Sequence, residues 1–151
     1  MANTQAMCTS FMGELLTATH NFGTAPVRAA TTADTFKAAL YLASATVNAS
    51  TTAYSATGEV SGTNYSAGGV TVTNATAPTT SGTTAYWTPS ASITYTNVTL
   101  STAFDAVLIY NSTQSNKAVS VHTFGSQTVT AGTFTLTMPT NDSSTGLIRL
   151  A

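Results

Sequence analysis

The strongest local signal for chemistry lies in the glycine-rich stretch of residues 56–72, ATGEVSGTNYSAGGVTV. Its four glycines surround one carboxylate, Glu59, and one tyrosine, Tyr65. Glycine loops bind phosphates when they open a helix after a strand, or when a lysine follows them. Here the β-branched segment VTVTN follows, and no lysine does. We therefore expect a turn into a strand, with Gly68 and Gly69 at positive φ, instead of a nucleotide site.

No group of residues close together in the sequence is arranged for acid–base or nucleophilic catalysis. The two histidines, His20 and His122, lie on different segments, and the alternation around His122 is typical of a strand-face structural histidine. The carboxylates Asp34, Asp105 and Asp142 each lack a second carboxylate nearby in the sequence. We therefore expect a protein that is not an enzyme and has no catalytic residues, and a hydrolase built on His122 is the least favoured class.

Metal and cofactor sites are not expected either. Cys8 is the single cysteine, so it has no intrachain disulfide partner and forms no cysteine-based metal site. The segment NDSST offers one carboxylate, Asp142, and neutral oxygens, which are too few for a tight calcium loop. This segment reads as a turn.

The low charge of the chain limits the classes of partner that it could bind. Charged residues make up 6% of the 151 residues, against about 25% in ordinary proteins, and the net charge is −1. Nucleic-acid binding needs clustered basic residues, and the four basic residues here are scattered. The longest apolar run, AVLIY at 106–110, is far shorter than the ~20 residues of a membrane span. A neutral surface instead suits a subunit packed beside many identical copies.

One helix is expected near the N-terminus. Between residues 8 and 22, apolar side chains recur with the spacing of one helical face, Ser10 can cap the start, and Gly23 suits the C-terminal cap. No basic and apolar leader precedes this segment, so we expect no signal peptide. We assign residues 1–34 to an N-terminal arm, which we expect to pack on its own domain rather than on a neighbour.

The rest of the chain, residues 35–151, reads as one β domain. Alternating or β-branched runs predict strands at 35–43, 69–76, 83–88, 91–100, 105–111, 117–124, 133–138 and 146–151. Turn signals separate them at 80–83, 111–116, 125–127 and 139–144. We therefore predict an all-β fold, an antiparallel β-sandwich of Ig-like or jelly-roll-like type with one short N-terminal helix.

Several segments together resemble a family of small structural proteins from the virions of tailed bacteriophages. They are SFMGELLTATHNFG, the stretch from TFKAALYLA to NYSAGG, and AVLIYNSTQSNKAVSVHTFG, and the similarity extends from Ser10 to about Met138. Asp105, just before AVLIYN, departs from the pattern, because a carboxylate is unexpected at the start of a central strand. Met12 also departs, since related helices carry a polar residue there.

The resemblance implies a non-enzymatic virion protein, made in the host cytoplasm. Its implied role is capsid decoration, in which it binds the major capsid protein and cements the lattice as a homo-oligomer. A neck or tail accessory protein is the alternative, followed by a carbohydrate-binding adhesion module. Aromatic residues carry much interface energy, so we take as candidate contacts Tyr54, Glu59, Tyr65, Tyr86 and Trp87. For Tyr86 and Trp87 a position in the core is an equal alternative.

Overall fold

Strands in two antiparallel sheets make up the fold, which confirms the all-β prediction. The computed structural model describes residues 3–8, 10–11, 15, 19–20, 22, 33–73 and 77–151. Within these ranges lie β1 (Ala6–Met7), β2 (Phe36–Leu42), β3 (Val70–Thr71), β4 (Thr79–Ser81), β5 (Thr84–Trp87), β6 (Ile93–Asn111), β7 (Lys117–Leu136) and β8 (Ile148–Leu150).

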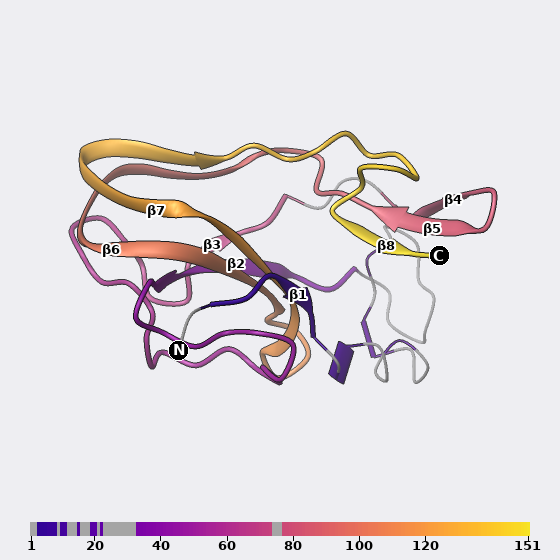
Figure 1. Cartoon of the computed structure of the whole chain (residues 1–151), viewed down its shortest axis with the longest axis horizontal. Helices are drawn as coiled ribbons and strands as arrows, with labels where there is room; N and C mark the ends of the chain where they lie inside the picture. The colour runs from indigo at the N-terminus through magenta and orange to yellow at the C-terminus, as the bar shows by residue number, and fades with distance from the viewer. Residues whose placement is uncertain are drawn as a thin grey trace.

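The larger sheet has the order β1-β7-β6-β2-β3 and the smaller one the order β4-β5-β8 (Figure 1). The larger sheet is built around the β6–β7 hairpin, whose strands are 19 and 20 residues long. The turn between them falls in the segment where it is predicted, and Ser115 and Asn116 take positive φ there. The predicted turn at 80–83 is likewise found between β4 and β5, with Gly82 at φ 58°.

The long hairpin corrects part of the strand prediction. The sequence pattern predicts four separate strands between residues 91 and 138, with a turn at 125–127, and this turn is wrong because β7 continues through it. The register between β6 and β7 shifts at several places, so that extra residues bulge from either strand. Such bulges bend both strands together, and Asn97 and Ala131 adopt positive φ within this region. The bend takes the place of the expected turn.

We call the half of the hairpin next to the turn at 112–116 the inner half and the half beyond the bend the outer half. The bend folds the outer half back over the inner half (Figure 1). Between the two halves, the rings of Phe104 and Phe134 pack edge to face with centroids 5.0 Å apart. Tyr95, which pairs with Phe134 on the outer half, donates its hydroxyl to the Ala38 carbonyl of β2 at 2.8 Å. One hairpin therefore supplies strands above and below the same apolar interior.

Strand β2 and the inner half of β6 are buried on both faces. The alternation in β2 predicts Phe36, Ala38, Leu40 and Leu42 on the inward face; the first three are buried, while Leu42 is half-buried. Ala39 and Tyr41 on the opposite face are buried as well, at 0% and 2% exposure. On one face Phe36 packs against Trp87 of the smaller sheet, and on the other the Tyr41 hydroxyl donates to the Ser55 carbonyl. A strand covered on both faces loses its polar side.

The helix predicted within residues 8–22 lies largely outside the described residues. The described side chains of Phe11 and Phe22 belong to the hydrophobic core, where Phe22 stacks on Phe36 with ring centroids 4.4 Å apart. The arm therefore packs on its own domain, as expected, and shares one core with the strands of residues 35–151.

Asp105, the carboxylate not expected at the start of a central strand, holds the residues before β1 in place through hydrogen bonds. The Asn3 side-chain amide donates to Asp105 Oδ1 and to the Leu42 carbonyl, and the Asn3 carbonyl oxygen accepts from the Val47 amide. These bonds hold the residues before β1 across the end of β2 and the neighbouring part of β6. The charge is tolerated because Asp105 is only half-buried and has a donor.

Candidate functional site

Glu59, the carboxylate of the glycine-rich stretch, is the centre of a hydrogen-bond network. The Tyr54 hydroxyl donates to Oε2 at 2.6 Å, and the Tyr65 hydroxyl donates to Oε1 at 2.7 Å. The Gly68 amide also donates to Oε1, at 2.8 Å. Charge-assisted bonds of this length are among the stronger ones in proteins. Three of the five predicted site residues thus meet in one cluster, which we call the Glu59 network.

The backbone on either side of Glu59 pairs with β2 as a strand would. The Leu42 amide donates to the Gly58 carbonyl at 2.9 Å, and the Val60 amide donates to the Leu40 carbonyl at 3.0 Å. This pairing places Glu59 opposite Tyr41. The glycine-rich stretch therefore continues the sheet edge where the short strand β3 stops.

Tyrosine hydroxyls fill the gap between β3 and this pairing. The Leu40 amide donates to the Tyr65 hydroxyl at 3.0 Å, while that hydroxyl donates to Glu59. The neighbouring Ala38 carbonyl accepts from the Tyr95 hydroxyl. Buried backbone groups without partners are costly, so these side chains complete the β2 edge that no continuous strand covers.

The glycines are required by close approach and by backbone conformation. A Cβ at Gly69 would lie 1.7 Å from the Ala38 carbonyl oxygen, and one at Gly62 would lie 2.0 Å from the Thr99 carbonyl oxygen. Gly68 and Gly69 have φ of 85° and 70°, as predicted. These positions bring backbone against backbone, and no helix follows them, so the stretch does not form a nucleotide-binding loop.

The tyrosines of the network stay protonated at physiological pH. Burial, and then the hydrogen bond to the Glu59 carboxylate, raise the pKa of both Tyr54 and Tyr65. Burial also raises the pKa of Tyr41 to about 12, partly offset by its bond to Ser55. The hydroxyls therefore act as neutral donors, and among the described residues no ion pair joins Glu59 to Lys37. The network stabilises the fold.

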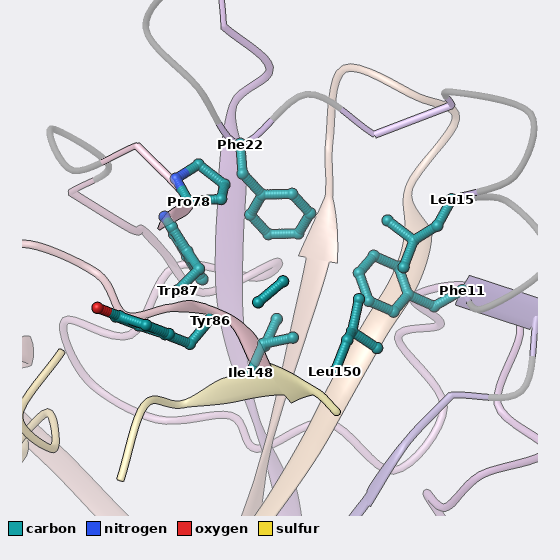
Figure 2. A pocket seen from close by; sticks show the side chains of 9 residues that line it. Phe11, Leu15, Phe22, Pro78, Tyr86, Trp87, Ile148 and Leu150 are labelled. Atoms are coloured by element: carbon teal, nitrogen blue, oxygen red, sulfur yellow. The ribbon is translucent and has the colours of Figure 1, made fainter. Parts of the chain in front are cut away.

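The other two predicted site residues lie on β5, apart from this network. Trp87 is 2% exposed and packs edge to face on Phe22, with ring centroids 4.7 Å apart, so it takes the core position of the two alternatives. Tyr86 is half-buried, and its hydroxyl points away from the hollow that its ring helps to line (Figure 2).

This hollow has a volume of about 100 Å³ and apolar walls, and it lies between the N-terminal arm and the smaller sheet (Figure 2). Its lining includes Phe11, Phe22 and Ile148, and Leu150 at its rim is 38% exposed. It has room for one apolar side chain, and the described residues of its lining present no group for acid–base chemistry.

A second polar cluster was not anticipated from sequence. The Asn111 side-chain amide donates to His20 Nδ1 at 3.0 Å and to Asp34 Oδ2 at 2.8 Å, and Gln114 donates to Asp34 Oδ1. The Asn111 carbonyl oxygen accepts the Thr113 and Gln114 amides, which fixes the amide orientation. His20, Asp34 and Asn111 are buried, so the cluster ties the arm to the hairpin turn. Separations of 77 and 91 residues hid it from local sequence patterns.

Ser120 and His122 form the closest approach to a catalytic pair. Ser120 Oγ lies 2.9 Å from His122 Nε2, beside a hollow of about 260 Å³ that Arg149 also lines. Burial lowers the pKa of His122 to about 4, so the ring is neutral at pH 7. Among the described residues no carboxylate bonds to the ring to orient it, as a triad requires. We therefore treat the pair as structural.

Clusters of metal ligands and membrane-spanning helices were sought in the part of the chain that the structure describes. No group of three or more potential ligands could hold a metal ion there. Within the same residues, no helix is both long and apolar enough to cross a bilayer. Asp142 is used in its own turn, where it accepts from the Ser144 and Thr145 amides.

Comparison with known proteins assigns no chemistry to these clusters. The chain matches no family model, no curated protein and no solved structure. Function must therefore follow from the geometry described above and from the sequence resemblance.

Glu59→Ala should lower the free energy of unfolding by about 2–4 kcal/mol, because it leaves the Gly68 amide and two hydroxyls without their acceptor. Urea unfolding followed by the fluorescence of Trp87, the single tryptophan, measures the change. Tyr54→Phe, which removes one donor, should cost about 1 kcal/mol. An unchanged unfolding midpoint for Glu59→Ala would contradict the structural role of the network.

Acid should destabilise the fold through His122. Its folded pKa of about 4 lies below the ordinary 6.5, so the unfolded chain binds more protons between these values. The contribution of His122 is complete above pH 6.5 and decreases as the pH falls toward 4. Between pH 7 and 4.5 it should lose about 2 kcal/mol. His122→Gln should show a smaller decrease over the same range, and equal decreases in both proteins would rule out this assignment.

Proposed function

We propose that the chain is a non-enzymatic structural protein of a tailed-bacteriophage particle, in which it decorates the capsid and stabilises the lattice. The residues that could do chemistry are engaged in holding the fold together, as the Glu59 network illustrates. The sequence resemblance between Ser10 and about Met138 gives the class of particle. Binding only to the assembled lattice stabilises it by mass action.

The observation that carries this proposal is the composition of the outer hairpin surface. None of its exposed residues carries a charge, and most bear hydroxyl or amide groups, among them Thr94, Thr96, Asn97, Ser101, Thr102, Gln127, Thr128, Thr130, Thr133 and Thr135. A charged surface repeated over a lattice would repel its own copies, whereas this one does not. A free enzyme or binding module gains nothing from such neutrality, because charge keeps soluble proteins apart.

The finer fold belongs to the same proposal. We class the two layers as a β-sandwich of Ig-like or jelly-roll-like type, because the outer half of the hairpin packs its aromatic residues over β2 and the inner half. A short helix within residues 8–22 completes the arm that carries Phe11 and Phe22 into the core. Such a two-layered unit suits a cementing role.

Tyr86 is the candidate contact with the major capsid protein. It combines partial exposure with a place on the rim of the apolar hollow, beside the exposed Leu150. A partner side chain seated in that hollow would bury both residues. Trp87 is already covered by the core and offers no free ring face for a sugar, so the adhesion alternative has less support.

The copy number in purified particles tests the role. A stained gel calibrated against the major capsid protein should give hundreds of copies per particle. A count of about six to twelve would indicate a single ring and favour the neck or tail alternative. Absence of the protein from particles that are otherwise complete would overturn the proposal.

Tyr86→Ser should weaken binding of the isolated protein to particles that lack it by about tenfold, which corresponds to loss of one interface anchor. Its unfolding free energy should change much less than that of Glu59→Ala, because Tyr86 is only half-buried. Ser50→Ala, on an exposed turn, is the matched control and should bind as the parent does. Equal binding by both variants would remove Tyr86 from the contact.

A further inference from the structure

Strand β7 has an edge that the described part of the chain leaves open. On the side away from β6, its first residues are covered: Ala53 bridges to Lys117, and β1 pairs with Ser120 and Val121. From His122 to Leu136 no other described residue pairs with this side. The backbone amides and carbonyls there face outward, a state that folded proteins usually avoid along long strands.

The usual protection of such an edge is missing. Charged side chains or prolines commonly block edge strands from pairing with other chains. Residues 118–141 contain no Asp, Glu, Lys or Arg, and their one proline, Pro139, lies beyond the strand. Bulges distort β7 up to Ala131. From Gly132 to Leu136 the one register shift, between Gly132 and Phe134, comes from an extra residue on β6, and β7 itself runs without a bulge. A regular, neutral stretch of edge is therefore available.

Behind this edge the apolar interior is incompletely covered. Phe134, Leu136 and Met138 point inward yet are only half-buried, while the alternating residues Thr133, Thr135 and Thr137 are exposed. A hollow of about 130 Å³ opens there, lined by Leu136 and Met138 above and by residues of the inner hairpin half below. One more strand at this edge would cover these side chains.

We propose that residues 132–136 of β7 pair antiparallel with the same residues of a second copy of this chain, about a two-fold axis. A strand that pairs with itself antiparallel satisfies its backbone groups symmetrically. The charge pattern selects this occupant, since a neutral edge placed against itself brings no like charges together, while a charged partner strand would find no counter-charge. Each copy then shields the half-buried Phe134 and Leu136 of the other.

This pairing goes beyond the proposed function, because it concerns the isolated chain and holds with or without a capsid. A dimer that fails to bind particles would refute decoration alone. A monomer that binds particles would refute the pairing alone. The two proposals can therefore fail separately.

Cysteine cross-linking tests the register. Cys8 is fully buried, so Thr133→Cys or Thr135→Cys introduces the accessible thiol. Facing Cβ atoms in an antiparallel pair approach closely enough for a disulfide. In this register Thr133 of one copy faces Thr135 of the other about Phe134, so mild oxidation of the two variants mixed should give a covalent dimer, while either variant alone should cross-link far less. Thr94→Cys, mixed with Thr133→Cys, is the matched control: it lies directly opposite Thr135 on β6, is likewise exposed but lies away from the β7 edge, and should not cross-link.

Introducing a charge at Thr135 tests the affinity of the dimer. Sedimentation equilibrium of the full chain should give a dimer, and Thr135→Lys or Thr135→Glu alone should raise the dissociation constant by about tenfold or more through like-charge repulsion. Mixing the two variants should restore dimers, while Thr94→Lys should dimerise as the parent does. A monomeric parent chain, or a dimer insensitive to charge at Thr135, would overturn the proposal.

Discussion

The outer edge of β2 is the constraint on which the rest of the structure depends. This strand is buried on both faces, yet β3 covers only its first residues. The remaining amides and carbonyls cannot reach water, and each needs a partner inside the protein. These partners come from separate parts of the chain: the backbone on either side of Glu59 and the hydroxyls of Tyr65 and Tyr95. The glycines, the tyrosines and the single glutamate of this stretch follow from that need.

A carboxylate is well suited to the centre of such an arrangement. The Tyr65 hydroxyl accepts from Leu40 and must therefore direct its own proton elsewhere, and Glu59 is an acceptor without a proton to offer. The same acceptor gathers the Gly68 amide at the sharp turn, so one side chain joins the sheet edge to the loop that closes it. In a chain with so few charges, this position is where a charge does most for the fold.

Sequence patterns predicted the elements whose signals are local. Alternation identified β2 and the buried run at 106–110, and turn residues located the ends of β6 and β7. They missed the continuity of both strands through the bend, because bulges at Asn97 and Ala131 depend on packing across the corner and leave no periodic trace. The Glu59 network had a readable signal, since Tyr54 and Tyr65 flank Glu59 within six residues. The cluster of His20, Asp34 and Asn111 had none, since only folding brings these residues together.

The bent hairpin also bears on how the chain reaches its native state. Both layers grow from the single turn at 112–116, so strand pairing can zip outward through contacts between near neighbours in sequence. The ends of β6 and β7, which are formed last in such a process, are the parts that fold back over β2. Covering the β2 edge then needs a long-range closure by residues 58–70, with its entropic cost. We therefore expect the late step of folding to involve the glycine-rich stretch.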